Sequence, residues 1–399
     1  MKSSRRPSKP ELVKTILGRG VDRVIERQHL ELALNSPRKL RVKLGIDPTS
    51  PDLHLGHSVV LRKLRQFQDL GHKVVFIIGD FTGQIGDPSG QSKERKILSE
   101  KEVRGNMGKY LSQAGKIIDL NKVETRYNSE WLGKNVKNLL LLAQAGTVQQ
   151  VIQRADFRAR IKQGRKVTLL ETFYPLLQGF DSVNIKADVE IGGTDQLLNM
   201  LMGRQVQSHF GMPQQDVLTV PLIEGTDGVR KMSKSYGNYI GLNDLPKDMF
   251  GKIMSISDGL VSKYFDLCTD IPQDEIKKDM DRLGPRDRKI KLAREIVTLY
   301  HGEKEAGEAE QEFVRVFQKK ELPQKVPVKT VRKLRYNLAE LLVTAGLAAS
   351  KSEARRLITQ GGVRMLGEKV LDPHKLVKSS SPYLLIKIGK KKFLRIRFK

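Results

Sequence analysis

A strand, a helix and a second strand in succession near the N-terminus constrain the fold of this chain more than any other feature. Leu40–Ile46 and Lys73–Ile78 are short apolar runs, and each leads into a turn rich in Gly, Asp or Pro. Leu55–Leu70, between them, has the apolar spacing of a helix. Two strands joined through a helix pair in parallel, so the pattern predicts an α/β fold with a Rossmann-like, doubly wound parallel sheet.

The remaining patterns divide the 399 residues into several domains, because the chain exceeds what one hydrophobic core usually organises. Helical periodicity dominates from about residue 100 to 165, and strand and turn patterns return at Asp188–Gln196 and Val217–Ile223. Glu321–Val331 has two prolines and no periodicity. The expected parts are an N-terminal extension (1–35), a Rossmann-like catalytic domain (36–230) with a helical insertion (about 100–165), a loop and helical domain (231–320), a linker (321–335) and a small C-terminal domain (336–399).

Charge and cysteine content limit the partners and the compartment. Lys and Arg number 72 and Asp and Glu 45, so the net charge of +27 points to a polyanionic partner, with nucleic acid the leading candidate. A single cysteine, Cys268, excludes an internal disulfide framework and a cysteine-based zinc site. No stretch approaches the ~18 apolar residues of a membrane span, and the basic start lacks the apolar core of a signal peptide. We therefore expect a cytoplasmic protein without membrane association.

A phosphate-binding turn is predicted where the first strand ends. Asp47-Pro48-Thr49 follows Ile46, and the next helix begins near Leu55, so backbone N–H groups and the positive helix end face the carboxyl edge of the sheet. His54 and His57 lie one helical turn apart, and both imidazoles are placed to donate to phosphate oxygens. Taken alone, these histidines also fit a metal pair that lacks a third ligand, or an ordinary first helical turn with a buried His.

A second phosphate-binding segment is predicted far along the chain, at Lys231–Ser235 (KMSKS). Gly225, Asp227 and Gly228 precede it, so it reads as a loop that carries two ammonium groups and two hydroxyls. Lysine is suited to following a phosphate during its transfer, because it is a compact charge on a flexible stem. By itself the loop also fits a solvated surface turn; the combination with the first segment favours a nucleotide site.

These two segments resemble the HIGH and KMSKS signatures of class I aminoacyl-tRNA synthetases, with Leu55 in place of the isoleucine. Within that class, Gly79–Gly90 (GDFTGQIGDPSG), Tyr174–Asp181 (YPLLQGFD) and Gly192–Gln196 (GGTDQ) resemble the tyrosyl-tRNA synthetases of bacteria, and the similarity covers nearly the whole chain. The resemblance implies that the nucleotide is ATP and that the phosphates meet Thr49, His54, His57, Lys231 and Lys234. It also implies ATP contacts from Gly56, Asp195, Ser235, Lys93 and Arg95.

A tyrosine pocket is predicted on one helix face. Tyr174, Gln178 and Asp181 fall at i, i+4 and i+7, which brings a hydroxyl, an amide and a carboxylate together. A buried phenolic hydroxyl needs a polar partner if phenylalanine is to be refused. By resemblance, Asp181 accepts the phenolic proton, and the substrate ammonium meets Tyr174, Gln178, Gln196 and Asp87. Without the other motifs, this pattern also fits a polar helix face with a half-buried Tyr.

Two positions depart from the pattern of the resembling family. Many relatives have a tyrosine that touches the phenol at the position of Lys43, so the second partner of the hydroxyl is open. Relatives often place a lysine directly after the second Gly of GDPSG, where this chain has Gln91. Lys93 and Arg95 are the nearby cations that would then bind pyrophosphate.

The C-terminal segment carries much of the positive charge. Val328–Lys399 has 18 Lys and Arg and 4 Asp and Glu, a net charge of +14. Helices are predicted at Leu338–Ala345 and from Ser350, which forms a capping box with Glu353, to Gly361-Gly362, and strands at Tyr383–Ile388 and Phe393–Phe398. This arrangement resembles the RNA-binding domain of ribosomal protein S four, and the alternative is a solvated basic tail. The candidate RNA contacts are Arg355, Arg356, Lys390, Lys391 and Lys392.

The resemblance implies an enzyme that activates L-tyrosine with ATP and transfers it to tRNA(Tyr). It implies that the helical domain at 231–320 serves the anticodon region of the tRNA. It also implies Mg²⁺ entering with ATP, no protein-bound metal, and a homodimer. Three alternatives remain at this point: a tryptophanyl enzyme with the same two signatures, an enzyme that adenylylates a small molecule, and a non-catalytic RNA-binding protein. A basic RNA-binding domain argues against the first two, and intact His54, His57 and Lys234 argue against the third.

Overall fold

The computed structural model describes residues 8–48, 51–87, 99–133, 136–318, 326–332, 335–378, 383–389 and 392–399. The chain forms two compact units, residues 1–307 and residues 308–399. The first unit contains a six-stranded sheet, and the second contains a five-stranded and a two-stranded sheet.

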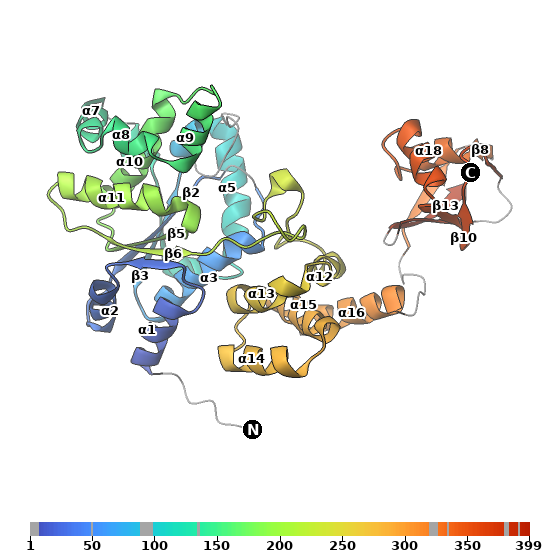
Figure 1. The fold of residues 1–399 in the computed structure, drawn as a ribbon, viewed down its shortest axis with the longest axis horizontal. Helices are drawn as coiled ribbons and strands as arrows, with labels where there is room; N and C mark the ends of the chain where they lie inside the picture. Colours follow the sequence, from blue (N-terminus) through green and yellow to red (C-terminus); the bar gives the residue numbers. More distant parts are fainter. Residues whose placement is uncertain are drawn as a thin grey trace. The chain divides into compact units, whose positions relative to one another are not determined.

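A six-stranded sheet organises the first unit (Figure 1). Its order is β1-β6-β5-β2-β3-β4, and all neighbouring pairs are parallel except β1 with β6. This topology confirms the predicted doubly wound parallel sheet. The strands are β1 (Arg23–Ile25), β2 (Arg41–Ile46), β3 (Lys73–Ile78), β4 (Val123–Tyr127), β5 (Val189–Gly193) and β6 (Asp216–Val220).

Helices cover both faces of this sheet. Figure 1 shows α10 and α11 on one side of the strands and α1 and α3 on the other. Alternate residues of β3 serve the two sides: Val75 and Ile77 pack in the cluster that contains Phe180 and Val206, whereas the ring of Phe76 lies near Tyr110. The helices are α1 (Lys9–Gly18), α2 (Arg27–Asn35), α3 (Leu55–Asp69), α4 (Thr82–Ile85), α5 (Glu100–Ala114), α6 (Ser129–Leu132), α7 (Val136–Gln144), α8 (Val148–Ile152), α9 (Ala155–Lys162), α10 (Leu169–Asn184) and α11 (Leu197–His209).

The segment after the sheet is helical, as expected for the domain at 231–320. α15 buries Leu292, Ile296 and Val297, one face of an amphipathic helix. Cys268 is buried at the end of α13, and its burial raises the pKa of the thiol to about 12. Among the described residues, no helix is long and apolar enough to cross a membrane. The segment contains α12 (Pro246–Met254), α13 (Val261–Cys268), α14 (Gln273–Arg282), α15 (Pro285–His301) and α16 (Glu303–Phe313).

After the end of α16 and a short helix at Val314–Gln318, the described part of the second unit has two further helices, a five-stranded sheet of order β10-β9-β12-β13-β7 and a β11-β8 pair. Ser350 caps α18 by accepting from the Glu353 N–H at 3.2 Å, but the Glu353 carboxylate accepts from Ala349 N–H rather than from Ser350, so the predicted box is half formed. A buried core makes the segment a folded domain, not a basic tail. The elements are β7 (Val328–Val331), β8 (Arg335–Asn337), α17 (Leu338–Thr344), α18 (Lys351–Thr359), β9 (Val363–Met365), β10 (Glu368–Val370), β11 (Leu376–Lys378), β12 (Leu384–Ile388) and β13 (Lys392–Phe398).

Three of the expected boundaries differ from the structure. The expected extension, 1–35, contributes edge strand β1, and the expected helical insertion contributes the opposite edge strand, β4. The expected linker, 321–335, contains β7, which pairs in parallel with β13. These strands have three to five residues and mix polar with apolar side chains, because an edge strand is only partly buried. Such short runs give no alternation that a sequence pattern can detect.

Candidate active site

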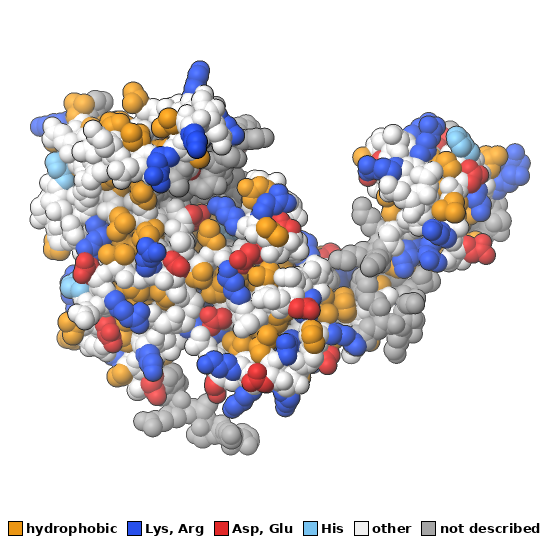
Figure 2. Space-filling view, viewed as in Figure 1, with side chains coloured by type: hydrophobic (Ala, Val, Ile, Leu, Met, Phe, Trp, Pro, Cys, Tyr) orange, Lys and Arg blue, Asp and Glu red, His pale blue; other side chains and the backbone are white. Residues whose placement is uncertain are grey.

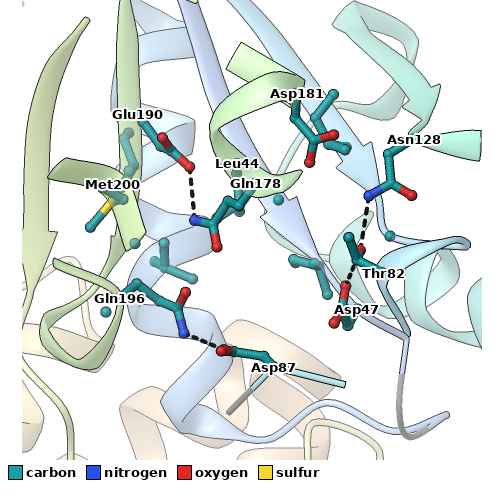
Figure 3. Close-up of a pocket in the computed structure, with 18 of the residues that line it drawn as sticks. Leu44, Asp47, Thr82, Asp87, Asn128, Gln178, Asp181, Glu190, Gln196 and Met200 are labelled. Carbon is teal, nitrogen blue, oxygen red and sulfur yellow. Dashed lines mark hydrogen bonds between the residues drawn. The ribbon is translucent and has the colours of Figure 1, made fainter. Parts of the chain in front are cut away.

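A cavity of about 260 Å³ opens at the carboxyl ends of the central strands. β2 lies between β3 and β5, and the chain builds the sheet outward on both sides of it. Ligands bind in doubly wound folds at this point, where neighbouring strands lead to opposite sides. Residues at the ends of β2, β3 and β5 line the cavity together with side chains of α10 and α11 (Figure 3).

His54 and His57 lie at the start of α3, and His57 lines the cavity. Their ring centroids are 3.9 Å apart, and the His54 backbone N–H donates to His57 Nδ1 at 3.2 Å. An accepting Nδ1 requires that the proton of a neutral His57 is on Nε2, which leaves that atom as a donor. Burial, the neighbouring His57 and the two lysines together lower the pKa of His54 to about 2, and burial together with the Lys234 cation lowers the pKa of His57 to about 4. Both rings are therefore neutral donors near pH 7.

The metal-pair alternative for these histidines gains no support. In the described part of the chain, no group of three or more His, Cys, Asp and Glu side chains is arranged to hold a metal ion. Gly56 lies two residues after His54, and a Cβ there would come within 3.0 Å of the His54 ring. A small residue at this position therefore keeps the His54 imidazole in place.

The KMSKS loop brings its two lysines to carboxylates. Lys231 Nζ lies 3.0 Å from Asp195 Oδ2, and Lys234 Nζ lies 2.8 Å from Asp52 Oδ2. Asp52 precedes the His54 pair by two residues, so the second signature meets the first in space. The segments are also joined by backbone hydrogen bonds, from Leu55 N–H to Ile240 O and from Leu242 N–H to Leu53 O, both 2.9 Å.

The side chain of Asn238 holds the KMSKS loop through hydrogen bonds, and the sequence did not predict this residue. It is buried, it accepts from Ser233 N–H at 2.8 Å, and its amide donates to Asp227 Oδ2 and to Lys231 O, both at 3.1 Å. Gly225 packs so closely on Asn238 that a Cβ would overlap it. A buried polar residue after a glycine-rich loop is the signal that could have identified it.

A hydrogen-bonded cluster surrounds Asp47 at the end of β2. Tyr174 Oη donates to Asp47 Oδ2 at 2.7 Å, Thr82 Oγ1 donates to Asp47 Oδ1 at 2.8 Å, and Asn128 Nδ2 donates to Thr82 Oγ1 at 2.8 Å. Figure 3 shows the last two contacts in a row along one wall of the cavity. Gly79 leaves no room for a side chain, since a Cβ there would overlap both Asp47 and Thr82.

Two glutamines predicted to bind tyrosine lie in the same cavity. Gln178 Nε2 donates to Glu190 Oε1 at 3.0 Å, and Gln196 Nε2 donates to Asp87 Oδ2 at 2.7 Å (Figure 3). Asn199 Nδ2 lies 3.1 Å from the side-chain oxygens of both glutamines. The sequence thus predicted Gln178, Gln196 and Asp87 as neighbours, but it gave no indication of their partners Glu190 and Asn199.

Asp181 is the buried carboxylate at another wall of this cavity. Trp131 Nε1 donates to Asp181 Oδ1 at 2.8 Å. Burial raises the pKa of Asp181 to about 7, against the opposing effects of the Lys43 cation and of the Trp131 and Asn128 donors. Near pH 7 the ionised form of Asp181 is therefore available, and this form accepts a hydrogen bond from a hydroxyl, as the predicted phenol contact requires.

Lys43 does not replace the tyrosine that many relatives have at its position. Its side chain is fully buried, and its ammonium lies 2.9 Å from Glu190 Oε1, 2.8 Å from Ser182 Oγ and 2.7 Å from Gln178 O. The ammonium is thus engaged by the wall of the cavity. The donor to the Asp181 carboxylate is the indole N–H of Trp131.

The structure brings most of the residues predicted to bind tyrosine and ATP to one region, and the others of this group lie outside the described residues. Thr49, Lys93 and Arg95 fall in segments that are not described, as do Lys390 and Lys391, and the side chain of Lys392 is not described. Asp195 lies in the turn after β5 and Ser235 in the turn Lys234–Tyr236. The residues brought together in or beside the cavity are His54, Gly56, His57, Asp87, Tyr174, Gln178, Asp181, Asp195, Gln196, Lys231, Lys234 and Ser235.

The second unit presents cations on two exposed surfaces. Arg355 and Arg356 are exposed on α18. On its sheet, Lys369 stands opposite Arg364, and Arg364 stands opposite Lys387. Like charges in directly opposed positions repel, and a polyanion relieves this repulsion. The sequence did not predict this row of Lys369, Arg364 and Lys387, because only the pairing register of the strands brings the three residues side by side.

Comparisons with known proteins agree with this geometry. The family model "tRNA synthetases class I (W and Y)" matches residues 35–318, and the model "Tyrosine--tRNA ligase SYY-like C-terminal domain" matches residues 318–396. Tyrosine--tRNA ligase of Thermotoga maritima is 49% identical, over 97% of this chain and 98% of its own length. Tyrosine--tRNA ligase of Carboxydothermus hydrogenoformans is 48% identical, over 96% and 97%.

A solved structure supports the fold. The C-terminally truncated mitochondrial tyrosyl-tRNA synthetase of Aspergillus nidulans superposes with a TM-score of 0.64 at 22% identity, covering 79% of this chain and 96% of that chain. At this identity the likeness is one of fold. With two family models that together span residues 35–396 and relatives of nearly equal length at about half identity, the chain belongs to the tyrosine–tRNA ligase family of class I tRNA synthetases.

Proposed function

We propose that this chain is a tyrosine–tRNA ligase, which activates L-tyrosine with ATP and transfers it to the 3′ end of tRNA(Tyr). The observation that carries the proposal is that Asp181 and His57 line one cavity, with Lys231 and Lys234 beside His54. An acceptor for a phenol and donors for phosphates thus serve the same space. The curated relatives that match this chain over nearly their whole length are named tyrosine–tRNA ligases.

The first step forms tyrosyl-adenylate. The tyrosine carboxylate attacks the α-phosphate of ATP, and pyrophosphate leaves with the electron pair of the broken phosphoanhydride bond. The protein needs no nucleophile, so its contribution is positioning and charge stabilisation. We assign the phosphate contacts to Thr49, His54, His57, Lys231 and Lys234, and further ATP contacts to Gly56, Asp195, Ser235, Lys93 and Arg95. Mg²⁺ is proposed to enter with the ATP phosphates and to balance their charge.

Tyrosine recognition uses the polar walls of the cavity. Asp87, Tyr174, Gln178 and Gln196 offer oxygen acceptors to the ammonium group, and Asp181 accepts the phenolic proton. Acceptors predominate at both ends, which matches a ligand that presents an ammonium and a hydroxyl donor. An indole N–H also needs an acceptor, so a tryptophan enzyme remains the competitor that the experiment must exclude.

The second step passes the tyrosyl group to a ribose hydroxyl at the 3′ end of the tRNA, which releases AMP. The basic second unit supports an RNA partner, because exposed cations neutralise phosphates and release counterions. We assign RNA contacts to Arg355 and Arg356 on α18 and to Lys390, Lys391 and Lys392. The single buried cysteine agrees with a cytoplasmic location, which remains a prediction.

A homodimer is proposed through the first unit. Large apolar side chains stay exposed on the helices between β4 and β6, where Figure 2 shows hydrophobic side chains gathered over α7, α8 and α10. Exposed apolar clusters mark interaction sites. Their exposed fractions range from 51% to 78% for Leu140, Val148, Ile161, Leu169 and Leu170.

Amino-acid-dependent pyrophosphate exchange tests the proposed function. With ATP and labelled pyrophosphate, L-tyrosine is expected to support exchange and L-tryptophan is not. Transfer is then measured as tyrosine bound to tRNA(Tyr). Exchange that depends on tryptophan, or on no amino acid, would contradict the proposal.

RNA binding by the second unit is expected to be separable from activation. Arg355→Ala with Arg356→Ala removes two exposed cations, so the affinity for tRNA(Tyr) should fall and the slope of log K against log salt should shrink by about 1 to 2. Tyrosine-dependent exchange should stay at the wild-type rate, because both residues lie outside the cavity. Lys14→Ala with Lys39→Ala, two exposed cations of the first unit outside the 231–320 domain, is the matched control. An unchanged salt slope in the Arg355/Arg356 variant would remove these residues from the RNA surface.

A further inference from the structure

We propose that Glu190 and Asn199 are positioning residues that lock the amide of Gln178, so that its oxygen faces the ammonium group of the substrate. The proposal rests on the proposed function, because it assumes that the ligand is tyrosine. A glutamine amide has a donor end and an acceptor end of nearly equal size, and only its partners decide which end faces a ligand. Gln178 is held at both ends by residues that the sequence analysis did not identify.

Glu190 fixes the donor end of the amide. It is 1% exposed, and its Oε1 accepts from Gln178 Nε2 at 3.0 Å. Lys43 holds the same oxygen at 2.9 Å, and Gln215 Nε2 donates to the other oxygen, Oε2. An ionised carboxylate has no proton to donate, so the group of Gln178 that faces it must be the NH₂.

Asn199 fixes the acceptor end. Its Nδ2 lies 3.1 Å from Gln178 Oε1, 3.1 Å from Gln196 Oε1 and 3.5 Å from Asp87 Oδ1. Its own orientation is set by Arg154, which is 5% exposed and donates from Nη1 to Asn199 Oδ1 at 2.8 Å. Arginine has no acceptor, so the oxygen of Asn199 must face Arg154 and its NH₂ must face the two glutamines.

The two fixed ends make the cavity selective for a donor. Both glutamine oxygens and the Asp87 carboxylate converge on one NH₂ group, so this part of the cavity is built from acceptors. An ammonium that enters has three N–H groups to share among them. Lys43 contributes by keeping the oxygen of Glu190 engaged, which explains why a fully buried cation stands in the wall of an amino-acid site.

Lys43→Met with Glu190→Met tests the lock. The two apolar side chains remove the acceptor that holds the Gln178 NH₂ and leave no buried ammonium without its carboxylate, so the Gln178 amide no longer holds its oxygen toward the substrate. Loss of one hydrogen bond to a charged group is expected to weaken tyrosine binding about 10- to 150-fold. Desaminotyrosine, which lacks the ammonium, should bind as it does to the wild type. The measurement is equilibrium binding of both compounds to the full chain, with the KM for ATP and the melting temperature followed in parallel.

The double variant Lys43→Met with Glu190→Gln distinguishes orientation from general damage. Its amide oxygen accepts from Gln178 Nε2 as Glu190 Oε1 does, so tyrosine binding should recover toward the wild type. An equal loss for tyrosine and desaminotyrosine in Lys43→Met with Glu190→Met, or no recovery in Lys43→Met with Glu190→Gln, would overturn the lock. A wild type that binds neither compound would instead overturn the proposed function.

Discussion

Lys234→Ala is expected to reduce the rate of tyrosine-dependent pyrophosphate exchange by about 10²- to 10³-fold. The lysine stands beside the histidine pair, and removal of one preorganised donor at a transferring group typically raises the barrier by ~2.7–4 kcal/mol. The effect should appear mainly in the rate of adenylate formation, because the tyrosine contacts lie in the cavity and stay intact. Single-turnover measurement of adenylate formation, with tyrosine binding measured separately, checks both parts.

Lys247→Ala is the matched control for this prediction. Lys247 is exposed on α12, in the same helical segment, and lies outside the cavity. Its removal changes the net charge by the same amount and should leave exchange unchanged. Equal rates for Lys234→Ala and the wild type would exclude the loop from adenylate formation.

Asp181→Asn is expected to lower the preference for tyrosine over phenylalanine about 10- to 150-fold. The variant replaces a charged acceptor by a neutral one, and hydrogen bonds to charged groups contribute about 1.5–3 kcal/mol. Phenylalanine makes no such bond, so its activation should change little. The ratio of kcat/KM for the two amino acids measures the effect, and an unchanged ratio would contradict the assignment of Asp181.

Tyrosine binding should also depend on pH through Asp181. The free protein holds this carboxyl with a pKa of about 7, raised by burial from 3.8. An ionised carboxylate accepts a hydrogen bond from the phenolic hydroxyl, so affinity for tyrosine should rise as the pH increases through about 7 and then level off.

The free energy of unfolding should depend on pH in the opposite direction. The folded state binds the Asp181 proton more tightly than the unfolded state, so the stabilisation from this proton is full below about pH 4 and is lost as the pH rises through about 7.

The control for the pH dependence is the same Asp181→Asn variant, which has no carboxyl to titrate. Its tyrosine affinity should be flat between about pH 6 and 8. The histidine pair does not interfere in this range, because burial lowers the pKa of His57 to about 4 and of His54 to about 2. A slope that persists in the variant would assign the titration to another group.

The sequence predicted the parts of the fold that have strong periodicity. β3 was predicted at its observed bounds, and α3 ends one residue earlier than its pattern, because buried strands and amphipathic helices leave clear apolar spacing. β1 and β4 were not predicted as strands of the sheet, because edge strands are short and half exposed. Their membership in the sheet depends on pairing with distant strands, which no local window contains.

The site was predicted to the extent that its residues share a helix or a signature. Tyr174, Gln178 and Asp181 occupy one face of α10, as their spacing requires. Glu190 and Asn199 were missed, because each acts on Gln178 at a distance in the sequence and neither has a local pattern. Asn238 was missed although its partner Ser233 is only five residues away, and its one signal is the glycine-rich loop before it. The role of Lys43 also required the folded protein, since only the structure brings Glu190 to it.

The contacts of Lys231 and Lys234 with Asp195 and Asp52 have a consequence for the order of events. In the resting protein each cation is already neutralised, so a weakly charged anion such as a single phosphate gains little by displacing a carboxylate. A triphosphate offers enough charge to compete with both. We expect the triphosphate to displace Asp195 from Lys231, which leaves this proposed ATP ligand able to accept from another part of the same nucleotide, so capture of one end of ATP would prepare the site for the other.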